Sequence, residues 1–345
     1  MSMEKVVIVG ASGYSGEELV RILSQHPFAE IAGVTSREHA GRPLAAVFPR
    51  FAGTRYAGLA FIPSTIEDII ATGARIVFLA LPHGVAAGFA APLIKAGLRV
   101  LDLSADFRIK DMATYAEFYG EAHHAPELAA MSVYGLSEIY RGQIKAAQLV
   151  ACPGCYPTSI LLPLIPLLRR RLIKAGSICV FSMSGVSGAG RTVKADLLFA
   201  ECNESVRAYS VPKHRHLAEI EQELSAAAGH TVAINFTPHL IPVNRGIHTT
   251  IYAAPEEGAE PSQIAAAFAE EYAGAKFVRI LGDAGNLPDT KMVTGTNFVD
   301  IAWRHDPRTG RLVLLSAEDN LVKGAAGQAV QNLNLMCGWP EDAAL

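Results

Sequence analysis

The sequence of 345 residues has no long uninterrupted hydrophobic run. Its most apolar stretch, residues 160–168, is interrupted by Pro163 and Pro166 and is far shorter than the roughly 20 residues of a membrane-spanning helix. The N-terminus also lacks the apolar segment and the small-residue cleavage site of a signal peptide. We therefore expect neither a membrane segment nor export, and we predict that residues 160–168 form a buried helix.

The sequence also has little charge of either sign and few cysteines. Charged residues make up 18% of the chain and the formal net charge is -3, so there is no basic field to attract nucleic acid or an anionic membrane. The five cysteines are an odd number, which favours a reducing compartment with free thiols. These features indicate a compact cytoplasmic protein with a small-molecule partner, and the length is typical of two domains.

The pattern of hydrophobic residues changes near residue 153. Before it, β-branched runs alternate with helical patterns, which is typical of an α/β doubly wound parallel sheet. After it, longer connections and alternating strands favour a mixed or antiparallel sheet, with a hairpin turn over 306–310 and a final helix over 321–337. The strands predicted in the second half are 178–183, 231–236, 248–253, 276–281, 298–305 and 311–316.

The segment VVIVGASGYSGEELVRIL predicts a phosphate-binding turn. Gly10, Gly13 and Gly16 stand between a predicted strand and a predicted helix. Glycines let the backbone approach a pyrophosphate, and exposed amides at the helix N-terminus bind its charge. The spacing is G-x-x-G-x-x-G rather than the commoner G-x-G-x-x-G, and an ordinary tight turn is the alternative. We favour a dinucleotide-binding domain of the Rossmann type.

The end of the second predicted strand favours NADP(H) over NAD(H). Ser36 and Arg37 stand where NAD-binding proteins more often carry a carboxylate for the ribose 2′-hydroxyl. A hydroxyl and a guanidinium suit a 2′-phosphate instead. Glu38 argues in the other direction, and a solvated surface charge is the alternative for Arg37.

Cys155 is the candidate nucleophile. In ACPGCYPTS a predicted strand stops at a Pro-Gly turn and a helix begins with Pro157 near its first position. A cysteine at a helix N-terminus is favoured as the thiolate, and the free amides there can hold a developing oxyanion. Cys152 and Cys155 also form a C-x-x-C, so a redox pair, or a zinc site completed by His214 and His216, is a less favoured alternative. We predict no metal.

The base that such a thiol needs is expected in KHRHLAEI. His216 and Glu219 are three residues apart and share one helix face, so the carboxylate can orient the imidazole. Histidine is the usual proton acceptor near neutral pH. Two histidines at a helix start are more often surface residues, so this assignment depends on their pairing with Cys155.

Taken together, the motifs resemble the N-acetyl-gamma-glutamyl-phosphate reductase family of arginine biosynthesis nearly end to end. Besides the segments above, the resemblance rests on LALPHG, LDLSADFR, YGLSE and SGVSGAGR. It implies a NADP-binding Rossmann domain over 1–153, completed by a C-terminal helix over 319–345. It also implies an α+β catalytic and dimerisation domain over 154–318, and a homodimer or homotetramer.

The resemblance further implies NADPH-dependent reduction of N-acetyl-L-glutamyl 5-phosphate to the semialdehyde and phosphate, the third step of the pathway, through a thioester on Cys155. His216 would then act as acid and base, supported by His214 and Glu219. Arg108, Arg191 and His214 are the expected substrate contacts. The expected cofactor contacts are Gly10, Ser12, Gly13, Tyr14, Ser15, Gly16, Ser36, Arg37, Pro82, Ser104, Gly188 and Asn320.

Two other functions remain open at this point. A reductase of lysine biosynthesis that acts on a carrier-bound aminoadipyl phosphate shares the catalytic motifs, and its carrier would need a basic docking surface, for which the sequence offers only Arg169-Arg170-Arg171. A non-catalytic NADPH sensor would keep the glycine turn but would need no activated thiol.

Overall fold

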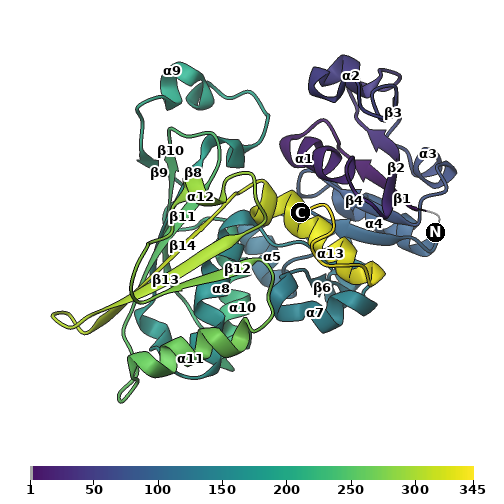
Figure 1. Ribbon diagram of the computed structural model, residues 1–345. Coiled ribbons are helices and arrows are strands. Elements are labelled where there is room, and N and C mark those ends of the chain that lie inside the picture. The colour runs from purple at the N-terminus through teal and green to yellow at the C-terminus, as the bar shows by residue number, and fades with distance from the viewer. Residues whose placement is uncertain (1–2) are drawn as a thin grey trace. The chain divides into compact units, whose positions relative to one another are not determined.

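The computed structural model describes residues 3–345 and divides into two compact units (Figure 1). The first unit comprises the chain up to residue 116, residues 121–153 and residues 325–345. The second comprises residues 117–120 and 154–324. The main division therefore falls between Pro153 and Gly154, and residues 319–324 belong to the second unit.

The first unit is built on a seven-stranded sheet with the order β3-β2-β1-β4-β5-β7-β6. All its neighbouring strands run parallel, which confirms the doubly wound sheet predicted from the sequence. The order reverses between β1 and β4, and ligands of such sheets bind at that point, beyond the carboxyl ends of the strands. The strands are β1 Glu4–Val9, β2 Ala29–Thr35, β3 Phe61–Ile62, β4 Ile76–Leu79, β5 Arg99–Asp102, β6 Val133–Tyr134 and β7 Leu149–Ala151.

The first unit also contains the helices that connect these strands and the final helix of the chain. They are α1 Tyr14–Leu23, α2 Leu44–Val47, α3 Ile66–Ala71, α4 Ala86–Lys95, α5 Met112–Tyr119, α6 Pro126–Met131, α7 Ser137–Ala146 and α13 Gly327–Cys337, of which α5 ends within the second unit. The final helix, α13, is almost wholly buried although it carries Gln331, Asn332 and Asn334. These amides are satisfied by hydrogen bonds, such as that from Asn332 Nδ2 to the Gly135 carbonyl oxygen at 2.8 Å.

The second unit is built on a seven-stranded mixed sheet with the order β12-β13-β14-β11-β8-β10-β9. The β8–β10 and β12–β13 pairs are parallel and the other pairs are antiparallel, which confirms the predicted mixed sheet and the β13–β14 hairpin. The strands are β8 Cys179–Gly185, β9 Arg207–Ala208, β10 Asn235–Ile241, β11 Ile247–Ala253, β12 Val278–Gly282, β13 Val299–Asp306 and β14 Arg311–Glu318.

The strand predicted at residues 231–236 is wrong in its position, because β10 begins only at Asn235. Side chains of the preceding helix, α10 (His216–Ala228), hold the backbone before it. The Val232 amide donates to Ser225 Oγ at 2.9 Å and the Ile234 amide donates to Glu221 Oε1 at 3.0 Å. These amides are therefore unavailable to a sheet.

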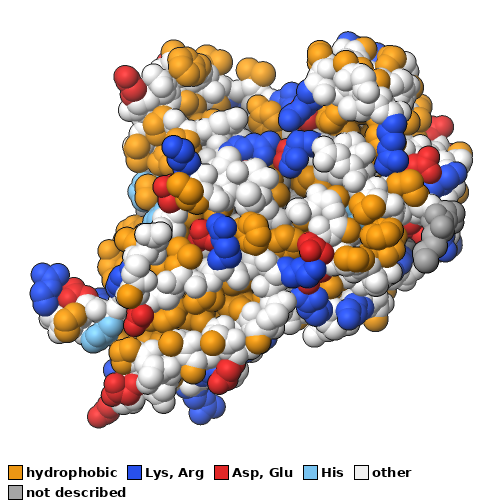
Figure 2. All heavy atoms as spheres, viewed as in Figure 1, with side chains coloured by type: hydrophobic (Ala, Val, Ile, Leu, Met, Phe, Trp, Pro, Cys, Tyr) orange, Lys and Arg blue, Asp and Glu red, His pale blue; other side chains and the backbone are white. Residues whose placement is uncertain are grey.

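One face of the second sheet is covered and the other is exposed. Helix α8, Cys155–Arg169, packs against β11, β14, α10 and α11 (Pro261–Glu271), and its residues from Tyr156 to Leu168 are all buried, as predicted. Ser159 and Ser182 anchor it through Thr249 Oγ1, each at 2.8 Å. The short helices α9, Phe199–Cys202, and α12, Thr290–Val293, complete the unit, and Figure 2 shows hydrophobic side chains gathered over α9.

A π-helical turn, Val322–Ala326, precedes α13, so the helix predicted from residue 321 is α-helical only from Gly327. Among residues 3–345, no helix is long and apolar enough to cross a membrane.

Candidate active site

Two helices of the second unit begin side by side at Cys155. Cys155 is the first residue of α8 and His216 is the first residue of α10. The Gly154 amide donates a hydrogen bond to Glu219 Oε1 at 2.9 Å, and Glu219 lies in the first turn of α10. Because both helix N-termini carry partial positive charge, their meeting favours a thiolate at Cys155 and an anion beside it.

Glu219 is completely buried, and its bond fixes Gly154, the residue that precedes Cys155. A buried carboxylate is stable only when hydrogen bonds satisfy it. The structure thus gives Glu219 a role in holding the turn at Gly154. The orientation of His216 by this carboxylate stays a prediction.

His214 is a neutral hydrogen-bond donor. The His216 amide donates to His214 Nδ1 at 3.1 Å, so the proton of a neutral His214 ring lies on Nε2. Burial, assisted by the neighbouring Arg215, lowers the pKa of His214 to about 4. The ring therefore stays uncharged at neutral pH and cannot accept a proton there. This chemistry suits a substrate contact better than a base.

Aromatic side chains surround this histidine. The rings of Tyr156, Tyr209 and Phe236 have their centroids 5.5, 5.4 and 5.6 Å from that of His214. Tyr209 Oη donates to Tyr156 Oη at 2.9 Å. Burial raises the pKa of both phenols, that of Tyr209 to about 12, so both stay protonated. These three rings shield His214 from water, and the two phenols do not act as bases at neutral pH.

Gly324, which is not among the residues predicted from the sequence, lies against Cys155. A Cβ at this position would be 2.8 Å from Cys155 Cβ and 3.0 Å from Glu318 Oε1. Only glycine lets the π-helical turn approach Cys155 this closely. The available signal was a glycine inside an apolar helical pattern, which often marks a close backbone approach.

Two predicted cofactor contacts lie close together in the second unit. Asn320 Nδ2 donates to Ser187 Oγ at 2.9 Å, and Asn320 Oδ1 accepts the Gly246 amide at 2.8 Å. A Cβ on Gly188 would lie 3.0 Å from Ser184 Oγ and 3.8 Å from Asn320 Nδ2. The Asn320 amide is thus held in one orientation beside Gly188.

The glycine turn of the first unit follows β1 and leads into α1. Gly10 has a φ of +84°, and a Cβ there would lie 2.4 Å from the Ala80 carbonyl oxygen. A Cβ on Gly16 would lie 2.3 Å from the Gly10 carbonyl oxygen, so both positions require glycine for packing. Gly13 has no such neighbour, since its nearest is that same oxygen at 3.7 Å. Its open side leaves room for a ligand to approach the backbone.

The other predicted cofactor contacts of the first unit lie at the carboxyl ends of its parallel strands. Ser12 Oγ and Ser36 Oγ are 3.0 Å apart, which ties the turn after β1 to the end of β2, while Arg37 is exposed. Tyr14 and Ser15 begin α1, Pro82 follows β4 and Ser104 follows β5. Because parallel strands end at one edge of a sheet, these residues lie along the same edge.

The two predicted substrate arginines belong to different units. Arg108 lies in the first unit, is 6% exposed, and donates from Nη2 to the Leu103 carbonyl oxygen at 2.8 Å. Arg191 lies in the second unit, as His214 does, and is exposed.

The C-x-x-C motif contains two cysteines in different environments. Cys152 is buried in the first unit, and burial raises the pKa of its thiol to about 12, so it is not a thiolate at neutral pH. All five cysteines are free. Within residues 3–345, no group of three or more His, Cys, Asp or Glu side chains is arranged to hold a metal ion.

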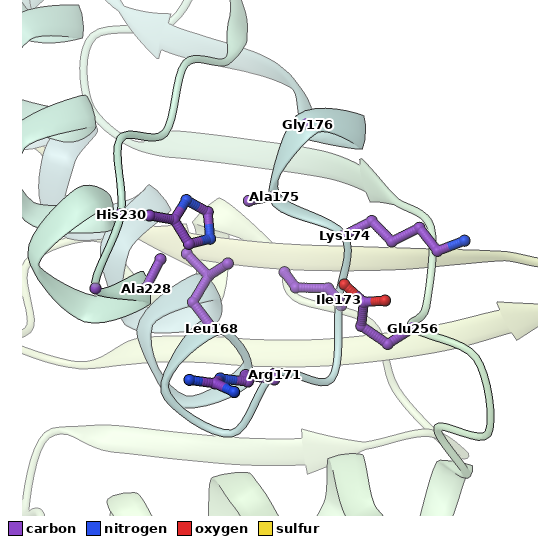
Figure 3. Close-up of a pocket in the computed structure, with 10 residues that line it drawn as sticks. Leu168, Arg171, Ile173, Lys174, Ala175, Gly176, Ala228, His230 and Glu256 are labelled. Atoms are coloured by element: carbon purple, nitrogen blue, oxygen red, sulfur yellow. The ribbon is translucent and has the colours of Figure 1, made fainter.

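A pocket of about 750 Å³ lies at the other ends of α8 and α10 (Figure 3). Its lining includes Leu168 and Ala228, and Leu168 is roughly 20 Å along α8 from Cys155 at 1.5 Å per residue. In Figure 3 the Lys174 side chain points away from His230 and Leu168. Arg171 and Lys174 line the pocket beyond the C-terminus of α8, where basic groups offset the negative end of a helix, and the pocket is remote from Cys155.

The chain matches known families over both units. Residues 5–147 match the semialdehyde dehydrogenase NAD-binding domain, and residues 155–320 match the semialdehyde dehydrogenase dimerisation domain. The N-acetyl-gamma-glutamyl-phosphate reductase of Akkermansia muciniphila is 56% identical over 100% of this chain and 99% of its own length. That of Pelotomaculum thermopropionicum is 51% identical over 99% of this chain and 97% of its own length.

A solved structure of aspartate semialdehyde dehydrogenase II from Vibrio cholerae, in complex with ASA, shares the fold. Its TM-score is 0.73 at 16% identity, and the match covers 98% of this chain and 99% of that one. The full-length relatives and the two matching domains show that the chain belongs to the N-acetyl-gamma-glutamyl-phosphate reductase family of the semialdehyde dehydrogenases.

Proposed function

We propose that this chain reduces N-acetyl-L-glutamyl 5-phosphate to N-acetyl-L-glutamate 5-semialdehyde and phosphate, the third step of arginine biosynthesis, with NADPH as reductant. The observation that carries the proposal is the meeting of the α8 and α10 N-termini at Cys155, joined by the bond from Gly154 to Glu219. The close relatives carry the name of this activity over their full length.

The chain's own residues account for the acyl-transfer step. The Cys155 thiolate attacks the acyl carbon, the bond from that carbon to the phosphate oxygen breaks, and phosphate leaves with the electron pair. The backbone amides at the start of α8 stabilise the oxyanion that develops. The product is a thioester that keeps the acyl group on the enzyme.

Reduction of the thioester gives a thiohemiacetal, whose collapse releases the aldehyde and the thiol. His216 at the start of α10 moves the proton in these steps, and His214 donates a hydrogen bond from Nε2 to the substrate. Arg108 and Arg191 are the proposed partners for the substrate carboxylate and phosphate, since a guanidinium binds both in a planar fork.

The first unit fits a dinucleotide. Helix α1 begins at Tyr14 and its N-cap residue, Gly13, has no side chain, so a diphosphate can approach the N-terminus of the helix over the open side of Gly13. Gly10, Ser12, Gly13, Tyr14, Ser15, Gly16 and Ser36 would hold the diphosphate and adenosine part, with Arg37 on the 2′-phosphate. Bound NADPH would supply the hydride that reduces the thioester.

The carrier-dependent reaction of lysine biosynthesis is less well supported. The basic residues that would dock an acidic carrier are partly neutralised within the chain. Arg169 pairs with Glu271 at 2.5 Å and Arg170 pairs with Glu270 at 3.0 Å. We therefore favour the free acetylglutamyl substrate.

The test is phosphate-dependent reduction of NADP by the purified protein with N-acetylglutamate semialdehyde, compared with Cys155→Ala. We expect activity in the wild type and at least about a 1,000-fold loss in the variant, because the thiolate cannot be replaced. Wild-type protein that binds NADPH but does not turn over this aldehyde would contradict the substrate and favour the carrier-bound one. Substantial activity in Cys155→Ala would contradict the thioester route.

The same proposal includes assembly and location. The exposed face of the second sheet carries Phe181, Met183 and Tyr252, which are 44%, 37% and 38% exposed, and this unit matches the family's dimerisation domain. An exposed apolar face of this kind is typical of an interface. We propose that two copies pair through it, as a homodimer or within a homotetramer. We also propose that the protein, whose five cysteines are all free, works in the reducing cytoplasm.

A further inference from the structure

A carboxylate from outside α4 caps the N-terminus of that helix in the first unit. Asp106 Oδ1 accepts the Gly84 amide at 2.7 Å and Asp106 Oδ2 accepts the Ala87 amide at 3.0 Å. Val85, the N-cap residue of α4, provides no side-chain cap. Asp106 follows β5 in the chain and is only 1% exposed, so this cap is a buried link between two connections of the sheet.

Two further residues hold Asp106 in place. The Asp106 amide donates to Ser104 Oγ at 3.1 Å, and that hydroxyl donates to Asp102 Oδ2 at 2.7 Å. The Ser104 amide donates to Asp102 Oδ1 at 3.0 Å. A continuous chain of hydrogen bonds therefore runs from the last residue of β5, through Ser104 and Asp106, to the loop after β4.

The cap distinguishes α4 from α1. These two helices follow β4 and β1, the strands between which the strand order reverses. Strands β1 and β4 pair directly, and α1 and α4 are the helices that follow them. The N-cap residue of α1, Gly13, has no side chain to offer the first amides of that helix, whereas Asp106 accepts the Ala87 amide of α4 and the Gly84 amide just before it. An anion is thus attracted to α1 and repelled at α4.

The strand order predicts how the dinucleotide is oriented along the edge of the sheet. Across the sheet the order is β2, β1, β4, β5. The proposed 2′-phosphate partners, Ser36 and Arg37, follow β2, and the diphosphate turn follows β1. The nicotinamide half then falls to the ends of β4 and β5, where Pro82 and Ser104 stand.

We propose that Asp106 is a positioning residue for the nicotinamide half of the dinucleotide. It occupies the Gly84 and Ala87 amides, so that they cannot bind the diphosphate, and it fixes the Pro82–Gly84 loop to Ser104. This inference rests on the proposed function for the identity of the ligand. Nothing in it requires Asp106 to touch the reacting atoms.

The test compares two ligands on Asp106→Asn. One is NADPH and the other is 2′-phospho-ADP-ribose, which lacks only the nicotinamide. The NH2 group of asparagine is a donor and cannot accept a backbone N–H, so one of the two bonds to Gly84 and Ala87 is lost and the Pro82–Gly84 loop is released. We expect the Kd for NADPH to rise about tenfold and the Kd for 2′-phospho-ADP-ribose to stay within about twofold. A general loss of structure would weaken both ligands and lower the melting temperature.

Asp111→Asn is the matched control. Asp111 lies on the same connection after β5, and its Oδ1 accepts the Thr114 amide at 2.7 Å in the first turn of α5, away from the bonds to Gly84 and Ala87. This variant should bind both ligands as the wild type does. Should Asp106→Asn not fold, Asp102→Asn weakens the same chain of hydrogen bonds at its other end and should also selectively weaken NADPH.

Equal binding of NADPH by Asp106→Asn and wild type, or an equal loss for both ligands in a folded variant, would overturn the positioning role. The outcome is separable from the reaction itself. A wild type that binds both ligands but lacks reductase activity would refute the proposed reaction and still let the binding ratio decide the role of Asp106.

Discussion

His214 and His216 are two residues apart, and the surroundings of His214 prevent it from serving as a base near neutral pH. The Nδ1 lone pair of His214 is committed to the His216 amide, and burial among aromatic rings disfavours its charged form. Replacement of His214 should therefore weaken substrate binding and leave the position of the acid limb of the pH–rate profile unchanged.

The depressed pKa of His214 also predicts an acid-labile fold. An unfolded chain takes up a proton at this residue below about pH 6.5, whereas the native state does so only below about 4. Stability is thus lost as the pH falls between these values, by about 2 kcal/mol at pH 5. His214→Gln, which cannot protonate, should lose less stability than the wild type when urea unfolding is compared between about pH 7.5 and about pH 5. An equal loss in both proteins would contradict the assignment.

Gly324 should tolerate no side chain. Gly324→Ala places a Cβ against Cys155 Cβ, so the nucleophile or the turn must shift. A misplacement of about 1 Å can cost about 100-fold in rate, and we expect a loss of kcat/KM of that order. Gly176→Ala is the control, because a Cβ there has no heavy atom within 4 Å. Normal activity in Gly324→Ala would show that the close approach is dispensable.

Arg37 should decide the preference for the phosphorylated cofactor. Arg37→Asp replaces a cation beside Ser36 with a carboxylate that repels a 2′-phosphate and accepts a 2′-hydroxyl. We expect the ratio of kcat/KM for NADPH over NADH to fall at least about 100-fold. Arg42→Asp, which changes another exposed arginine in this region, should leave the ratio close to that of the wild type. A retained preference in Arg37→Asp would refute the assignment of NADP.

Local sequence patterns were enough to predict the residues whose conformation depends on their neighbours in the chain. Cys155 begins a helix as its Pro-Gly turn predicted, and Gly10 needs its left-handed φ at the end of β1. Gly324, Tyr209 and Asp106 depend on partners far away in the chain or on another strand end. A single sequence does not show such partners, so these residues became visible only in the folded chain.

At the level of elements, the bond between Gly154 and Glu219 joins two helices whose N-termini must stay together. Glu219→Gln keeps an oxygen that accepts the Gly154 amide but loses the charge, whereas Glu219→Ala leaves a buried amide unpaired. The alanine variant should lose about 1–3 kcal/mol of unfolding free energy and most activity. The glutamine variant should keep its stability and lose much less activity. Equal damage by the two substitutions would show that the negative charge is what matters.

The elements were predictable where hydrophobic periodicity coincided with backbone pairing. Strands β8, β11 and β14 fall within a few residues of their predicted positions. Strand β10 does not, because Ser225 and Glu221 bind the amides before Asn235. The two-residue strands β3, β6 and β9 are too short to produce any pattern.

For the whole molecule, the exposed sheet face of the second unit should determine assembly. Phe181→Asp places a charge in the apolar face beside Tyr252, whose ring centroid is 6.2 Å away, and we expect multi-angle light scattering to show smaller particles. Leu287→Asp changes another exposed hydrophobic residue of the same unit and should leave the mass unchanged. An unchanged mass in Phe181→Asp would place the interface elsewhere.

The first unit was predictable from the sequence for most of its length. Regular βα alternation made the first unit predictable, since parallel strands need helical crossovers. Its final piece, α13, returns from the end of the chain. The sequence pattern predicted this helix over 321–337, but only the family resemblance implied that it completes the first unit.

Cys155, His214, His216 and Glu219 all belong to residues 154–324, whereas the glycine turn belongs to the other unit. The residues proposed for acyl transfer thus lie in one unit, and the turn proposed to bind the dinucleotide lies in the other. Exchange of the phosphoryl leaving group for another oxyanion needs only the thiol and its surroundings. A variant in which a bulky residue replaces Gly13 should still catalyse that exchange after it has lost all redox activity, because the residues proposed for acyl transfer lie in the other unit.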